Sequence, residues 1–202
     1  MMNIPPAAID PTTADLPALQ DLLLDLFCQL AYQEGDFTLS SGKKSDYYIN
    51  GKEVTLHPQG AVAIGRLILP LLPPETAAVA GLTLGADPIV SAVSVVSTYA
   101  GRPMPGLIVR KEAKGHGTAA YIEGMKLPEG AEVVVLEDVV TTGGSAMKAV
   151  ERLRAAGYVV NRVIALVDRQ QGGAEFYRSV NLDFHSIFQI SQLKTHYQKI
   201  HS

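Results

Sequence analysis

The sequence predicts an α/β protein in which a mostly parallel, twisted sheet is flanked by helices and carries a small N-terminal hood. Short apolar segments alternate with segments of helical periodicity along most of the chain, which is typical of βαβ units. Most of the strand segments are largely apolar, as expected for strands that are covered on both faces. The 202 residues, 47% of them hydrophobic, suffice to bury a core without a disulfide or a metal. We therefore expect a single domain over 1–202.

The N-terminal part of the chain predicts the hood. Residues from about 1 to 15 contain several prolines and small side chains, which favours a loose lead-in. Apolar residues at i, i+3, i+4 and i+7 predict a helix over 16–32, and Gly35 is suited to end it. The apolar segments 37–39 and 47–49 flank a Ser/Gly/Lys turn and predict a hairpin. Helix and hairpin together make up the hood over about 16–50.

A regular alternation of strands and helices is predicted after the hood. Pro58 suits the first turn of a helix over 57–69, and Asp87 is a candidate N-cap ahead of Pro88 for a helix over 87–99. A third helix is predicted over 145–156. Strands are predicted over 77–81, 104–110, 133–136, 159–168 and 183–188. Ligands bind at the carboxyl ends of parallel strands, so functional residues are expected after residues 80, 110, 136 and 167.

Composition excludes several classes of protein. Cys28 is the only cysteine, so no intramolecular disulfide can form, and a reducing, cytoplasmic location is expected. The net charge of −3 gives no support to nucleic-acid binding. No segment reaches the ~18 uninterrupted apolar residues of a membrane helix, and the N-terminus does not resemble a secretory signal. A soluble cytoplasmic domain is therefore expected.

The most informative segment follows the strand predicted over 133–136. Two acids, Glu137 and Asp138, precede a candidate phosphate loop over 141–145 with the sequence TTGGS, which leads into a helix. Glycines let the backbone approach an anion, and the first amides of a helix lack partners within it. The segment matches neither a Walker A loop nor a dinucleotide-binding fingerprint.

The acid pair limits the kinds of ligand that this segment can bind. A carboxylate beside the phosphate loop would repel a bare phosphate, so a suitable ligand carries hydroxyls or a metal a few ångströms from its phosphate. A ribose 5-phosphate meets this demand, with its phosphate on the loop and its ring hydroxyls on Glu137 and Asp138. The alternative is a solvated strand end followed by a helix-capping turn.

A basic loop over 110–117 is the second candidate segment. Arg110, Lys111, Lys114 and His116 stand against a single glutamate, and the glycines on either side of His116 permit movement. Cations at this place would attract an anionic part of a ligand, and a loop of this kind can close over a site. The alternative is a solvated surface loop.

Arg169 follows the strand predicted over 159–168, on the ligand side of the sheet. A guanidinium matches a planar carboxylate with two parallel hydrogen bonds, so Arg169 is a candidate carboxylate-binding residue. A turn arginine is the alternative.

Four segments in this order resemble a known family. VVVLEDVVTTGGS is similar to the phosphoribosyl pyrophosphate signature of the type I phosphoribosyltransferases. With FTLSSGKKSDYYIN, VRKEAKGHGTAAYIEG and VDRQQGG, the chain resembles the orotate phosphoribosyltransferases from about residue 37 to 173. It departs from many relatives at Ser40, where they carry a basic residue, and in having no lysine between residues 80 and 100. Both departures remove positive charge from the substrate end.

The resemblance implies a fold, a reaction and a set of site residues. The expected reaction transfers the ribose 5-phosphate of phosphoribosyl pyrophosphate to N1 of orotate, giving orotidine 5′-monophosphate and pyrophosphate in pyrimidine nucleotide synthesis. Mg²⁺ is the expected cofactor, held mainly by substrate oxygens with no firm protein ligand. A homodimer is also implied, in which loop 110–117 reaches the neighbouring subunit's site. Lys114, His116, Glu137 and Asp138 are the implied catalytic residues.

The implied contacts fall into two groups. Those to phosphoribosyl pyrophosphate are Arg110, Lys111, Lys114, His116, Glu137, Asp138, Val139, Val140, Thr141, Thr142, Gly143, Gly144 and Ser145; those to orotate are Thr141, Arg169, Tyr48 and Ile49. Two other functions remain open. A purine-type phosphoribosyltransferase would not need Arg169 with Thr141, because a purine offers no carboxylate. A non-catalytic regulator that senses phosphoribosyl pyrophosphate would require a basic surface or an added nucleic-acid-binding element.

Overall fold

The computed structural model describes residues 9–38, 42, 44–114 and 121–201. Its main sheet has six strands in the order β5-β4-β3-β6-β7-β8. The strands are β3 (Ala78–Leu82), β4 (Gly106–Val109), β5 (Ile122–Glu123), β6 (Val133–Val140), β7 (Arg162–Asp168) and β8 (Asp183–Gln189). All neighbours pair in parallel except β5, which runs antiparallel to β4. The prediction of a mostly parallel α/β sheet is confirmed.

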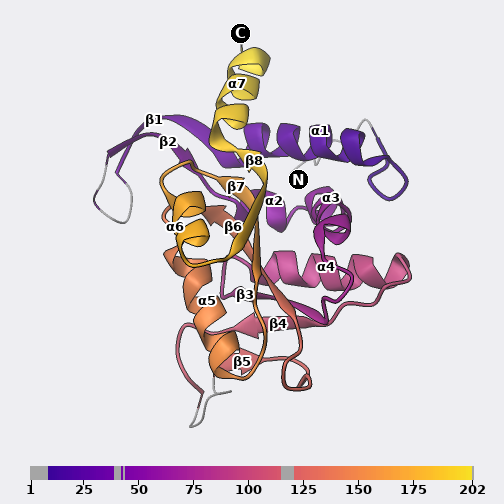
Figure 1. Ribbon diagram of the computed structural model, residues 1–202. Helices are drawn as coiled ribbons and strands as arrows, with labels where there is room; N and C mark the ends of the chain where they lie inside the picture. Colours follow the sequence, from indigo (N-terminus) through magenta and orange to yellow (C-terminus); the bar gives the residue numbers. More distant parts are fainter. Residues whose placement is uncertain (1–8, 39–41, 43, 115–120, 202) are drawn as a thin grey trace.

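Helices cover both faces of this sheet (Figure 1). α3 (Pro58–Ile68) and α4 (Asp87–Tyr99) lie on one face, with α1 (Leu16–Leu26) packed against α3. α5 (Gly144–Ala155) and α6 (Gly173–Ser179) lie on the other face. Alternate residues of β6 serve the two layers, since Val134 and Leu136 pack in the first and Val133 and Val135 in the second. Residues 133–136 of β6 are thus buried on both sides, which explains why all four are apolar.

The hairpin of the hood is an antiparallel pair, β1 (Tyr32–Thr38) and β2 (Lys44–Ile49), which forms a sheet separate from the main one. It follows a π-helical turn, η1 (Phe27–Ala31), and leads into the short helix α2 (Lys52–Thr55). The C-terminal helix α7 (Ile190–His201) rises beside it (Figure 1), and Lys194 Nζ lies 2.8 Å from the Asp46 carboxylate in β2.

Several element boundaries differ from the prediction. The first helix does not reach Gly35, because Tyr32 already pairs with Ile49 in the hairpin. β6 continues past residue 136, since Val139 and Val140 remain paired with β7. The N-cap of α4 is Ala86, and Asp87 is the first helical residue. The sequence did not predict β5, α6, α7 or the 3₁₀ turn η2 (Leu69–Leu71). Within the described residues, no helix combines the length and apolar character needed to cross a membrane.

Candidate functional site

The strand order places the candidate site between β3 and β6. From β3 the chain passes through α4 to β4 on one side, and from β6 it passes through α5 to β7 on the other. The loops that leave the carboxyl ends of these adjacent strands therefore diverge and leave a crevice between them, where ligands bind in sheets of this kind.

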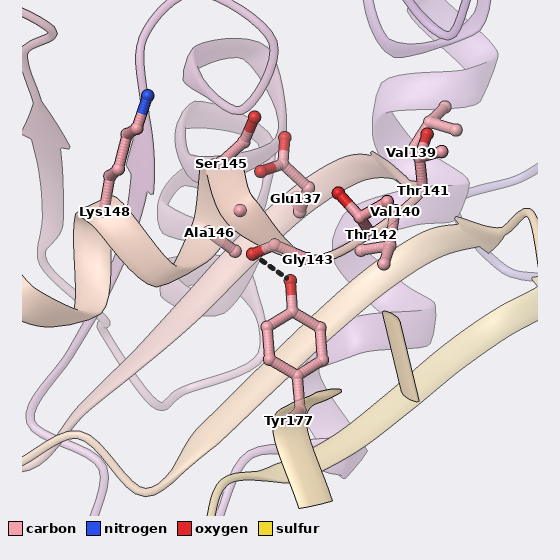
Figure 2. A pocket seen from close by; sticks show the side chains of 11 residues that line it. Glu137, Val139, Val140, Thr141, Thr142, Gly143, Ser145, Ala146, Lys148 and Tyr177 are labelled. Carbon is pink, nitrogen blue, oxygen red and sulfur yellow. Dashed lines mark hydrogen bonds between the residues drawn. The ribbon is translucent and has the colours of Figure 1, made fainter. Parts of the chain in front are cut away.

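The phosphate loop and its surroundings enclose a cavity of about 280 Å³. Its lining (Figure 2) is Glu137, Val139, Val140, Thr141, Thr142, Gly143, Gly144, Ser145, Ala146, Lys148 and Tyr177. Eight of these were predicted from the sequence. Ala146, Lys148 and Tyr177 were not, although Lys148 lies one helical turn after Gly144 and its spacing could have indicated it.

The phosphate loop offers its backbone amides to this cavity. Gly143 is the N-cap of α5 and has a left-handed backbone with φ 88°. In the described part of the chain, the Met147 amide donates to the Gly143 carbonyl at 3.1 Å, whereas no turn or cap carbonyl accepts from the amides of 142–146. Free amides at a helix start, together with the helix dipole, bind a phosphate.

Glu137 lies within the cavity but is 6% exposed, and its Oε2 has no hydrogen-bond partner in the described structure. Burial, and then the neighbouring Asp138 carboxylate, raise the pKa of Glu137 well above its ordinary range. The positive charge of Lys111 opposes these effects. Glu137 therefore keeps its proton to higher pH than an exposed glutamate does.

Asp138 does not line this cavity but faces the loop that follows β3. A Cβ built on Gly85 would lie 2.9 Å from both Asp138 carboxylate oxygens, so only glycine permits this approach. Thr83 Oγ1 donates to the Asp87 carboxylate at 2.8 Å within the same loop, whose Thr83–Leu84 peptide bond is cis. The acid pair therefore connects the phosphate loop to the loop after β3.

Arg169 directly follows β7 and is 8% exposed. Its amide donates to the Val140 carbonyl at 2.9 Å, which places it beside the phosphate loop. Its Nε donates to the Tyr47 hydroxyl at 2.8 Å, and its guanidinium lies 4.7 Å from the centre of the Tyr47 ring. The guanidinium is therefore oriented by the hood before any ligand binds.

The hairpin residues divide between two faces of the hood. Ser45 and Tyr47 face Arg169, with Ser45 Oγ 3.4 Å from Nη2. Tyr48, which the sequence placed at the base, is 43% exposed and contacts Phe37. Ile49 is half-buried. The two-residue period of a strand, applied from Ile49, would have indicated Tyr47.

The described part of the basic loop lies outside the cavity. Arg110 Nη1 and Lys114 Nζ lie 3.1 and 3.8 Å from Glu123 Oε1. Arg152 of α5 donates to the carbonyls of Arg110 and Lys111 and thereby attaches the loop to the helix that follows the phosphate loop. His116 and Ser40 lie outside the described residues. No group of three or more His, Cys, Asp or Glu in the described residues is arranged to hold a metal ion.

Comparisons with known proteins converge on one enzyme family, although no family model matches the chain. The chain is 73% identical over 190 residues to an orotate phosphoribosyltransferase of a Nostoc species, covering 94% of this chain and 92% of the relative. It is 63% identical over 187 residues to that of a Synechocystis species, covering 93% and 94%.

Solved structures agree with these relatives. Mycobacterium tuberculosis orotate phosphoribosyltransferase with Fe(III) dicitrate has a TM-score of 0.77 at 38% identity, covering 87% of this chain and 98% of that one. The same enzyme with 5-phospho-α-D-ribosyl 1-diphosphate has a TM-score of 0.73 at 34% identity, covering 87% and 99%. Identity this high over nearly the full length of the relatives shows that the chain belongs to the orotate phosphoribosyltransferase family.

Proposed function

We propose that this chain transfers the ribose 5-phosphate group of phosphoribosyl pyrophosphate to N1 of orotate, giving orotidine 5′-monophosphate and pyrophosphate. The observation that carries the proposal is the placement of two complementary sites on adjacent strand ends. The phosphate loop follows β6, and buried Arg169 follows β7, with the Arg169 amide bonded to the Val140 carbonyl at 2.9 Å. One accepts a phosphate and the other a carboxylate, and orotate bears a carboxylate whereas purines do not.

Different residues of the chain bind the phosphate, the ribose and the base during the proposed reaction. The phosphate loop binds the 5-phosphate and fixes C1 of the ribose in the crevice. Glu137 and Asp138 bind the ring hydroxyls. As the C1–O bond to pyrophosphate breaks, its electron pair leaves with the pyrophosphate. N1 of orotate loses its proton to water and forms the new bond to C1. Asp138, with its negative charge, favours the positive charge that develops on the ribose.

Mg²⁺ is proposed as the cofactor. The half-exposed Asp138 carboxylate lies against Gly85, where a Cβ would fill the space, and carboxylate oxygens are ligands that Mg²⁺ accepts. Asp138 would hold the ion through the ribose hydroxyls, and most ligands would come from the substrate. When bound, the ion neutralises the leaving pyrophosphate.

A homodimer is proposed, with loop 110–117 serving the neighbouring subunit's site. Lys114 has a 72% exposed side chain and lies outside its own chain's cavity, which supports this arrangement. A groove of about 640 Å³ beside α3 and α4 also supports it. Leu56, Leu84 and Val95 line this groove and are exposed, so a second copy would cover apolar surface there.

We further propose a single domain over 1–202 and a cytoplasmic location. The domain proposal rests on the hood contacts, since Arg169 and Lys194 attach β2 to the main sheet and to α7. The location rests on the cysteine usage. Cys28 is buried, and its burial raises the pKa of the thiol to about 12.

The direct test is orotate consumption, followed by absorbance, with phosphoribosyl pyrophosphate and Mg²⁺. We expect turnover that depends on all three components. Turnover with adenine or hypoxanthine, but not with orotate, would instead identify a purine-type enzyme. Binding of phosphoribosyl pyrophosphate without turnover of any base would identify a regulator.

A further inference from the structure

We propose that Tyr177 is a positioning residue, which holds the phosphate loop in the conformation that binds the 5-phosphate of the substrate. The proposal rests on the proposed function, because it assigns a role to the same cavity. It concerns a residue of α6, a helix that the sequence did not predict.

The contact between Tyr177 and the phosphate loop is direct and fully buried. The Tyr177 hydroxyl donates to the Gly143 carbonyl at 3.1 Å, across 34 residues of sequence (Figure 2). The side chain has 0% exposure. Burial also raises the pKa of Tyr177, so the hydroxyl keeps its proton and remains a donor.

This hydrogen bond sets the direction of an amide. The peptide unit between Gly143 and Gly144 is planar and trans, so its C=O and N–H point in opposite directions. The Tyr177 hydroxyl and the Met147 amide both bind the carbonyl, each at 3.1 Å. With the carbonyl held on the protein side, the Gly144 amide is directed toward the cavity, which Gly144 lines.

The ring of Tyr177 also restricts where the loop can lie. A Cβ built on Gly143 would lie 2.8 Å from Phe176 Cδ1 and 3.0 Å from Tyr177 Cζ, so the loop rests on these two rings. A Cβ on Gly173 would lie 2.4 Å from Val140 Cγ1, which shows that the start of α6 packs closely on the end of β6. The Tyr177 ring in turn lies 5.0 Å from the Phe184 ring of β8. The loop is thus supported by a layer of packed aromatic rings.

The test compares Tyr177→Phe with the matched control Tyr158→Phe. Tyr177→Phe removes the hydroxyl and keeps the ring, so it should fold. Tyr158 belongs to the same apolar layer, and its hydroxyl accepts from the Leu127 amide at 3.4 Å, outside the residues that line the cavity. Each protein is titrated with ribose 5-phosphate by calorimetry, and KM for each substrate, kcat and Tm are measured.

We expect Tyr177→Phe to raise the Kd for ribose 5-phosphate and the KM for phosphoribosyl pyrophosphate about three- to tenfold. The KM for orotate should stay within about twofold, and the rise in KM for phosphoribosyl pyrophosphate should exceed any change in kcat. Tyr158→Phe should leave both constants at the wild-type values. A merely structural role would lower Tm without this selective effect.

The proposal is overturned if Tyr177→Phe binds ribose 5-phosphate as tightly as the wild type. An equal weakening in Tyr158→Phe, or an equal rise in the KM for orotate, would overturn it as well. Failure of the proposed function is a different result: the wild type would then bind ribose 5-phosphate but not consume orotate. In that case the ratio of the two Kd values still tests Tyr177.

Discussion

Replacing Gly143 by alanine should destabilise the protein strongly, because two separate costs meet at this residue. Its φ of 88° is left-handed, which costs an alanine about 1–2 kcal/mol. The added Cβ would lie 2.8 Å from the Phe176 ring and 3.0 Å from the Tyr177 ring, and overpacking of this kind costs about 1–3 kcal/mol. We expect the free energy of unfolding to fall by about 2–5 kcal/mol.

Alanine substitutions at two other glycines allow the backbone cost and the packing cost to be measured separately. Gly172 has a φ of 92° but no atom within 4 Å of a built Cβ, so Gly172→Ala should lose only about 1–2 kcal/mol. Gly144 has neither feature and begins α5, so Gly144→Ala should be neutral or stabilising by up to about 1 kcal/mol. Urea unfolding of the three variants measures the differences. A loss in Gly143→Ala no larger than that in Gly172→Ala would refute the packing of α6 against the phosphate loop.

Three further changes test the site. Arg169→Lys should raise the KM for orotate about 10- to 100-fold in steady-state assays, because an ammonium cannot form the two parallel hydrogen bonds of a guanidinium. An unchanged KM would show that Arg169 does not bind orotate. Lys114→Ala should lower kcat at least about tenfold, because it removes a positive charge that stabilises the leaving group. Tm should hardly change, because the ion pair of Lys114 with Glu123 is largely exposed. A large fall in Tm would show that Lys114 stabilises the fold instead. The raised pKa of Glu137 means that the folded state keeps this proton to higher pH than the unfolded chain. Stability from this group is therefore full below the ordinary Glu pKa and is lost as pH rises through the raised value. Glu137→Gln should flatten that fall in urea unfolding series across pH, and an unchanged pH profile would contradict the assignment.

The sheet and its helices were predictable because their signals are local. Residues 133–136 of β6 are apolar and buried on both sides, and this apolar run predicts a buried strand without reference to the rest of the fold. The prediction ended this strand too early, at residue 136, because two adjacent acidic residues usually lie exposed to solvent. Here Glu137 is buried, and backbone pairing of Val139 and Val140 with β7 continues the strand beyond the acids.

The residues that the sequence did not reveal depend on contacts between distant segments. Tyr47 meets Arg169 across 122 residues, and Tyr177 meets Gly143 across 34. Nothing in GAEFYRS distinguishes a tyrosine that supports a phosphate loop from one in an ordinary core. The glycines of TTGGS predict close approach of an anion, but not that aromatic rings support the loop from beneath.

The central claim is that a carboxylate-bearing base is selected by Arg169 beside a site for ribose 5-phosphate. Competition in one reaction tests it most directly. Orotate, adenine and hypoxanthine are supplied together at equal concentration with limiting phosphoribosyl pyrophosphate and Mg²⁺, and the nucleotide products are separated by chromatography. We expect orotidine 5′-monophosphate as the product, with Arg169→Ala abolishing it. A purine nucleotide as the main product, or orotidine 5′-monophosphate formed equally by Arg169→Ala, would show that Arg169 does not select the base.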